Sequence, residues 1–94
     1  MQVRSITHKG LRRLYEEDSP KGLGADTVDK LRKMLGFLDV MHDPEELRAL
    51  PTWKAHKLTG DRRGTWSLHV TRNWRMTFRV EGDEIVEVNL EDYH

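Results

Sequence analysis

The final residues of the sequence carry three side chains that can act together in proton transfer. Asp92 offers a carboxylate, Tyr93 a hydroxyl and a stacking ring, and His94 an imidazole that titrates near neutral pH. Cleavage of RNA without a metal ion requires a base for the 2′-hydroxyl, an acid for the leaving 5′-oxygen and cations around the phosphorane. Strand pairing should place the cation of Arg75 beside this segment. These residues therefore indicate a candidate site for RNA cleavage.

The other histidines are candidates for the same chemistry or for structural roles. His56 precedes the glycine-containing loop TGDRRG, and His69 lies on the polar side of an alternating segment, opposite Arg75. His8 and His42 fall at the start and end of predicted helices, where we expect structural or solvated roles. The sequence has neither HExxH nor paired Cys/His spacing, so a zinc or manganese site would need residues from separate strands: His56, His69, Asp92 and His94. We therefore expect no metal and no cofactor.

Charges are sorted along the chain, although the formal net charge is zero. Residues 52–79 contain seven Lys and Arg against one acid, whereas residues 80–94 contain six acids and no Lys or Arg. Arginine forks bind phosphate oxygens in a bidentate manner, so the basic segment is a candidate surface for RNA. A solvated, salt-bridged sheet face is the alternative interpretation of the same pattern. The residues that we expect to contact RNA are Lys57, Arg62, Arg63, Arg72 and Arg79.

Size and composition restrict the class of protein. A chain of 94 residues suffices for one domain with a thin core. It has no cysteine, which excludes disulfides and thiolate metal sites and is compatible with an intracellular location. No apolar run reaches the length of a membrane span or a signal peptide. We therefore expect a single domain over residues 1–94, located in the cytoplasm and without a membrane partner.

Two helices are predicted in the first half of the chain. Leu11, Leu14 and Tyr15 recur at helical spacing after Thr7, which we expect to be the N-cap. The sequence EEDSPKGLG then predicts a loop. A second helix, with Asp26 as its cap, is predicted from one apolar stripe: Val28, Leu31, Met34, Leu35, Leu38 and Met41. QVRSI near the start predicts a short strand, and MHDPEELRALP a short turn of helix.

The period of the apolar residues then changes from 3.6 to 2, which predicts antiparallel strands in three segments: 66–70 (WSLHV), 74–80 (WRMTFRV) and 85–90 (IVEVNL). A slip of one residue would put arginines into the core, so the apolar sides define the register. Leu68 should face Met76, and Val70 should face Trp74. Asn73 ends the three-residue turn between these strands, where we expect it to be left-handed.

The same rule gives the pairing of the last two segments: Val80 with Val86, Phe78 with Val88, Arg79 with Glu87, Arg75 with Glu91, and Arg72 near His94. The end of the sequence is thus expected to form a strand beside the basic strand. Glu91 would be the structural partner of Arg75 within that strand pair.

Three stretches of the sequence resemble the HigB-type toxins of the RelE/ParE superfamily: HKGLRRLYE (8–16), HKLTGDRRGTWSLHVTRNWRMTFR (56–79) and EDYH (91–94). The resemblance implies an α+β, RelE-like fold in which two N-terminal helices pack on an antiparallel sheet of about four strands. It also implies a toxin that cuts messenger RNA on the ribosome without a metal ion. A helix-turn-helix antitoxin of the HigA type would neutralise it, and operator DNA would be contacted only through that antitoxin.

The catalytic residues implied by the resemblance are His56, Arg75, Asp92, Tyr93 and His94. His56 and either Asp92 or His94 would share the acid and base roles, with the base unassigned. Arg75 would contact the scissile phosphate, and Tyr93 would orient or stack on a base.

One position departs from the pattern of the family. Thr59 stands where some relatives carry a lysine, and threonine cannot supply a positive charge. Stabilisation of the phosphate must then come from Arg75, Arg62, Arg63 or Lys57, or be weaker. Two alternatives to a nuclease remain within the superfamily, namely a gyrase-directed toxin that acts by binding and a catalytically weak toxin. The combination of His56, Arg75 and the terminal Asp-Tyr-His favours the nuclease.

Overall fold

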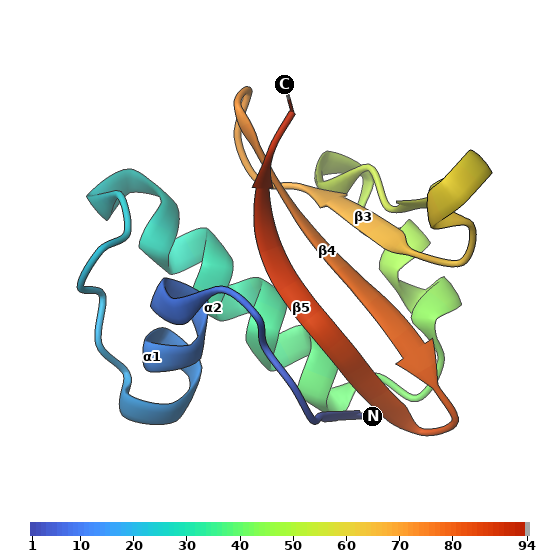
Figure 1. The fold of residues 1–94 in the computed structure, drawn as a ribbon, viewed down its shortest axis with the longest axis horizontal. Helices are drawn as coiled ribbons and strands as arrows, with labels where there is room; N and C mark the ends of the chain where they lie inside the picture. The colour runs from blue at the N-terminus through green and yellow to red at the C-terminus, as the bar shows by residue number, and fades with distance from the viewer. Residues whose placement is uncertain (94) are drawn as a thin grey trace.

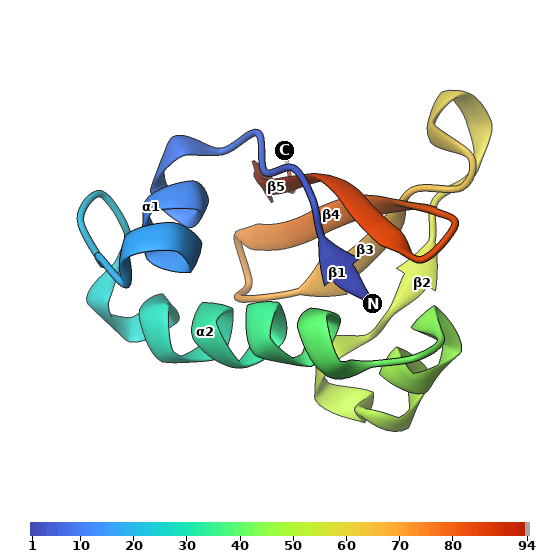
Figure 2. The same ribbon diagram turned by 90° about the horizontal axis from the view of Figure 1, so that it is seen from below.

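A computed structural model describes residues 1–93 of the protein. In chain order its elements are β1 (Gln2–Val3), α1 (Lys9–Glu17), α2 (Ala25–Val40), the short 3-10 helices η1 (Pro44–Ala49) and η2 (Pro51–Trp53), β2 (His56–Lys57), η3 (Gly60–Arg62), β3 (Trp66–His69), β4 (Trp74–Glu81) and β5 (Glu84–Asp92). Helix α2 runs beneath the sheet, and α1 packs beside α2 (Figures 1 and 2). No helix within the described range is long and apolar enough to cross a membrane.

The described strands form one sheet in the order β1-β5-β4-β3-β2. Strand β1 pairs with β5 in parallel, and all other neighbours are antiparallel. The predicted α+β class with helices on a mostly antiparallel sheet is confirmed. The sheet has five strands instead of about four, because the two-residue strands β1 and β2 extend its two edges.

Both helices begin at residues other than the predicted caps. His8 caps α1, since its Nδ1 accepts a hydrogen bond from the Leu11 amide at 3.2 Å. Thr7 is still held by β5, because its amide donates to the Val88 carbonyl at 2.8 Å. Helix α2 begins after Gly24, so Asp26 lies within the first turn, where its charge favours the helix dipole.

The core lies between α2 and one face of the sheet. The residues that α2, the strands and the turn after β3 contribute to it are Val3, Val28, Leu31, Met34, Leu35, Leu38, Trp66, Leu68, Val70, Met76, Phe78, Ile85 and Val88. The apolar stripe of the second helix is therefore confirmed. The predicted core position of Trp74 is wrong, because this side chain is 38% exposed at the end of β4.

The hairpin between β3 and β4 has the predicted register. Leu68 pairs with Met76, and the amide of Val70 donates to the Trp74 carbonyl at 3.0 Å. The predicted left-handed Asn73 is wrong, since this residue is not among those with positive φ. The turn closes instead through the Trp74 amide, which donates to the Thr71 carbonyl at 3.3 Å.

A β-bulge in β5 changes the predicted register of the second hairpin. Arg75 does pair with Glu91, but Val80 pairs with Ile85 and Arg79 with Val86. Glu87 has a φ of 56° at this irregularity. The extra residue reverses the alternation of side chains along β5. Ile85 and Val88, three residues apart, are therefore both fully buried in the core. Strict alternation would have left one of them outside.

Candidate active site

The face of the sheet that points away from α2 is polar. Directly paired residues in an antiparallel sheet share a face, as do residues two apart along one strand. His69 of β3 pairs with Arg75 of β4, which pairs with Glu91 of β5. One row further along, His56 of β2 pairs with Ser67 of β3. The sheet therefore gathers two histidines, an arginine and a carboxylate on one surface.

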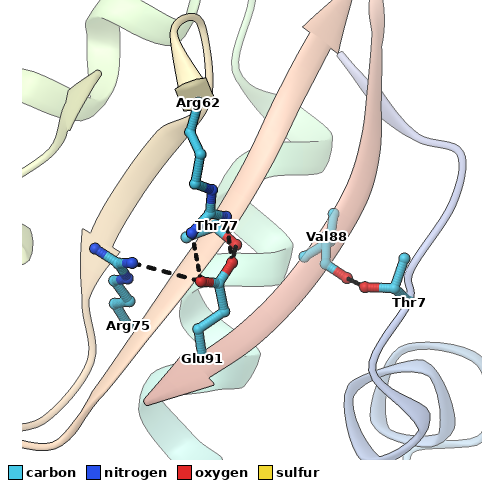
Figure 3. A network of polar contacts seen from close by, with 6 residues as sticks. All are labelled: Thr7, Arg62, Arg75, Thr77, Val88 and Glu91. Carbon is cyan, nitrogen blue, oxygen red and sulfur yellow. Dashed lines mark hydrogen bonds and ion pairs between the residues drawn. The ribbon is translucent and has the colours of Figure 1, made fainter. Parts of the chain in front are cut away.

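Glu91 is the centre of a polar network on this face, shown in Figure 3. Arg62 of η3 donates to both carboxylate oxygens of Glu91, at 2.6 and 2.5 Å. The hydroxyl of Thr77 donates to Oε2, and Nη2 of Arg75 lies 3.5 Å from Oε1. The carboxylate thus accepts hydrogen bonds from η3 and from β4, and these bonds connect both elements to β5.

This environment favours the charged form of Glu91. Its pKa is lowered from 4.5 to about 2, chiefly by the hydrogen bonds from Arg62, with further contributions from the Thr77 hydroxyl and from the charges of Arg62 and Arg75. Burial opposes this shift, since the side chain is only 18% exposed. The same contacts raise the pKa of Arg62. Glu91 is therefore a carboxylate throughout the physiological pH range.

Replacing Glu91 by glutamine is expected to lower the free energy of unfolding at pH 7 by roughly 1 to 3 kcal/mol. The folded-state pKa of Glu91 lies below its unfolded value, so its contribution is present above about pH 5 and is lost as the pH falls towards 2. Urea unfolding of wild type and Glu91→Gln across this window should show the two stabilities converging. A difference that stays constant down to pH 2 would contradict the prediction. Glu45→Gln, which breaks an exposed pair with Arg48, should change stability by less than about 0.5 kcal/mol.

Tyr93 lies against Arg75 and His69. The guanidinium carbon of Arg75 is 5.6 Å from the centre of the Tyr93 ring, a cation–π distance. The Tyr93 hydroxyl is 3.0 Å from Nδ1 of His69. The backbone amide of Tyr93 donates to the Asn73 carbonyl at 3.0 Å. Three contacts thus hold Tyr93 on the polar face, although its side chain remains 38% exposed.

From the sequence, His69 was expected to line the polar surface and was not included among the catalytic residues, yet it joins this cluster. Burial lowers its pKa, and the positive charges of Lys54 and Lys30 lower it further. The imidazole is therefore neutral at pH 7 and can pair with the Tyr93 hydroxyl. Its predicted position opposite Arg75 was the signal that could have revealed it. Thr77 was also missed, although alternation places it between Arg75 and Arg79 on the polar side.

His56 is exposed and has a defined tautomer. Its Nδ1 lies 2.8 Å from the carbonyl oxygen of Lys54, which can only accept, so Nδ1 carries the proton. In the neutral ring, Nε2 then has the free lone pair. Two strand spacings and two residues separate His56 from Arg75, about 12 Å between Cα atoms.

The predicted site residues do not all lie on this face. Asp92 pairs with Trp74, and alternation directs its side chain to the other face of β5. Lys57 pairs with Trp66, and its Nζ lies 5.4 Å from the centre of that ring, also on the other face. The predictions for His94 fall outside the described residues.

The remaining arginines of the basic segment differ in their partners. Arg79 pairs with Glu87 at 3.3 Å and with Glu81 at 3.9 Å. Arg63 and Arg72 are exposed and form no ion pair among residues 1–93. The interpretation as a salt-bridged sheet face therefore holds for Arg62, Arg75 and Arg79, and the interpretation as an RNA surface stays a prediction. Within this part of the chain, no three His, Asp or Glu side chains are grouped so as to hold a metal ion.

The arrangement of helices and sheet is similar to that of solved bacterial toxins. A YoeB/ParE toxin from Agrobacterium tumefaciens matches with a TM-score of 0.59 and 18% identity, covering 100% of both chains. YafQ from E. coli strain BL21(DE3) matches with a TM-score of 0.57 and 11% identity, covering 98% of this chain and 92% of the other. At these identities the likeness defines the fold, which is that of the RelE-like toxins.

Sequence comparison assigns the family. The family model of the RelE-like toxin of type II toxin-antitoxin system HigB matches residues 4–94. The chain is also 40% identical over 93 residues to Endoribonuclease HigB of Proteus vulgaris, which covers 98% of this chain and 99% of the relative. The protein belongs to the HigB-like toxins of type II toxin–antitoxin systems, so an antitoxin is its partner. The predicted resemblance is confirmed.

Proposed function

We propose that this toxin is an endoribonuclease that cleaves messenger RNA in the aminoacyl site of the ribosome without a metal ion. The observation that carries the proposal is the pairing of β5 with β4, which brings Tyr93 to the guanidinium of Arg75 on the face that also carries His56. The 40% identity to an endoribonuclease supports the reaction class. The fold and the family support the role as a toxin.

Arg75 has the properties of a group that stabilises a phosphorane. It is permanently charged, its side chain is only 22% exposed, and it stands at the centre of the polar face. A fixed cation in a partly dehydrated site stabilises developing negative charge more than a mobile one in water. We assign Arg75 to the scissile phosphate.

His56 is the best candidate for the general base. The hydrogen bond from its Nδ1 to the Lys54 carbonyl leaves Nε2 as a proton acceptor for the 2′-hydroxyl. The acid that protonates the 5′-oxygen would come from His94, because alternation along β5 directs the side chain of Asp92 to the other face of the sheet. Tyr93, held by His69 and Arg75, would stack on a base and orient it for in-line attack. The ribosome would supply further positioning of the RNA.

The exposed cations would bind the RNA backbone and the ribosome. Arg63 and Arg72 lie on the loop and the hairpin that flank the polar face, and Arg79 lies on β4 itself. Lys57 would contact RNA or the ribosome from the edge strand β2. A helix-turn-helix antitoxin of the HigA type is the proposed partner, the cytoplasm the proposed location, and operator DNA would be reached only through the antitoxin.

Expression of the toxin in bacterial cells tests the function directly. We expect growth arrest accompanied by shortened transcripts with cuts inside translated codons, and unchanged plasmid supercoiling. A variant lacking Tyr93 and His94 should lose most of this activity, because the proposed acid and stacking ring are removed, yet still fold and bind antitoxin. Transcript mapping and plasmid topology are measured in the same cultures.

Two results would contradict this proposal. Altered supercoiling with intact transcripts would support the gyrase-directed alternative, and undiminished toxicity of the truncated variant would exclude the terminal residues from the chemistry. Metal independence is tested separately with purified toxin and ribosome-bound mRNA. Cleavage that stops with a chelator, while the ribosomes remain intact, would show that a metal ion takes part.

A further inference from the structure

Two of the arginines on the polar face share one carboxylate within the protein itself. Arg62 of η3 and Arg75 of β4 both contact Glu91, which lies on β5 (Figure 3). Arg75 is the residue assigned to the scissile phosphate, and Arg62 belongs to the basic segment expected to bind RNA. An RNA phosphate at this position would therefore compete with a carboxylate for the same donors.

The donors around Glu91 form an anion site. Two N–H groups of Arg62, one of Arg75 and the hydroxyl of Thr77 converge on a single carboxylate from separate parts of the fold. Arginine forks and a hydroxyl are the groups that recognise phosphate oxygens in proteins. Carboxylate and phosphodiester groups each present two charged oxygens, so one can replace the other at these donors.

Glu91 does not satisfy all the polar groups in this site. Nη2 of Arg75 is 3.5 Å from the carboxylate, at the limit of a hydrogen bond, and Nε of Arg75 is buried without an acceptor among residues 1–93. The hydroxyl of Ser67, which pairs with Thr77 across β3 and β4, is also buried without a partner in this part of the chain. Since such groups are costly to leave unpaired, an additional acceptor is expected in the functional complex.

The segment that carries Arg62 contacts β5 through the side chains of Arg62 and Glu91. Gly60 and Gly64 flank it with φ values of 72° and 91°, a region that glycine adopts at little cost. Its backbone hydrogen bonds are local, from Arg63 to Gly60 and from Thr65 to Arg62. Protonation would not release it, because the pKa of Glu91 is about 2, so release requires a competing anion.

We propose that Arg62, Arg75 and Thr77 form a phosphodiester subsite that Glu91 occupies in the free toxin and that a backbone phosphate of the RNA occupies in the complex. The ligand class rests on the proposed function. Glu91 would then be a stand-in for substrate, and it would weaken binding of RNA outside the ribosome. A purely structural Glu91 would instead support RNA binding by holding the arginines in place.

The test measures affinity for a 2′-O-methyl RNA oligonucleotide, which lacks the attacking hydroxyl, by fluorescence anisotropy with ribosome-free toxin. Glu91→Gln removes the internal anion and is expected to tighten binding roughly fivefold. Glu84→Gln is the matched control, because it removes an equal charge from the same strand but belongs to the exposed pair with Arg4, which has no proposed contact with RNA. It should tighten binding less than about twofold. Unchanged or weaker binding by Glu91→Gln overturns the proposal.

A second measurement uses the wild-type protein and so does not depend on the stability of the variant. The Nε–H signals of Arg62 and Arg75 in ¹⁵N NMR spectra should shift when the same oligonucleotide is added. Shifts confined to Arg63 and Arg72 would overturn the subsite. Neither measurement requires cleavage, so tighter binding by Glu91→Gln together with intact transcripts in cells would refute the nuclease and retain the subsite.

Discussion

Replacing Arg75 by alanine is expected to lower the rate constant for cleavage of ribosome-bound mRNA by roughly a hundred- to a thousandfold. The guanidinium is the only group from β4 that contacts both Tyr93 and Glu91 within the described chain, so it stands where the proposed stacking base and phosphate meet. Its removal would take away charge stabilisation that exists mainly in the transition state. Single-turnover cleavage with toxin in excess over programmed ribosomes measures this step.

Two variants separate catalysis from folding. Arg75→Lys keeps the charge but not the fork, so its cleavage rate should lie between those of wild type and Arg75→Ala. Arg4→Ala is the control, because Arg4 forms an exposed pair with Glu84 on the edge of the sheet, and its rate should match that of wild type within about twofold. Wild-type cleavage by Arg75→Ala, with all proteins folded by circular dichroism, would remove Arg75 from the mechanism.

The largest loss of stability is expected for Trp66→Ala. Trp66 is 2% exposed and stacks on Phe78 with ring centres 6.4 Å apart. The guanidinium of Arg48 lies 5.0 Å from the Trp66 ring, which connects β3 to η1. Truncation removes this packing and leaves a cavity, so the free energy of unfolding should fall by about 3 to 5 kcal/mol. The midpoint of thermal unfolding should fall by roughly 15 to 30 °C.

Trp74→Ala provides a matched comparison, because the same atoms are removed from a side chain that is 38% exposed. Its cost should stay below about 1 kcal/mol. Urea unfolding followed by far-ultraviolet circular dichroism measures both variants without relying on tryptophan fluorescence. Equal losses for the two tryptophans would show that the buried and exposed assignments are wrong. The loss in Trp66→Ala should also reduce toxicity, since Ser67 and His69 lie on the same strand.

The strand register shows how far alternation of side chains can predict a site. Arg75 was placed opposite Glu91 because any slip would bury arginine, and the structure has this pair. The same argument failed four residues further along, at Arg79, and again at Val80. A bulge there allows both Ile85 and Val88 to enter the core, and a rule based on strict period two contains no bulge.

The prediction of where the first helix begins was wrong for a related reason. Thr7 has a good capping side chain, but its backbone hydrogen-bonds to Val88, a residue distant in sequence, so the helix begins one residue later. Capping preferences describe local competition among neighbouring groups. They contain no information about a strand that arrives from the other end of the chain.

The sequence by itself determined the α+β class, the core stripe of α2, the pairing of Arg75 with Glu91 and the family. These follow from the period of apolar residues and from motifs, which are properties of contiguous segments. Only the tertiary structure decided that Arg62 reaches Glu91, that Tyr93 contacts His69 and Arg75, and that Lys57 and Asp92 lie on the other face. These contacts depend on where a loop folds over the sheet and on how β5 ends, and both result from packing between segments far apart in the chain.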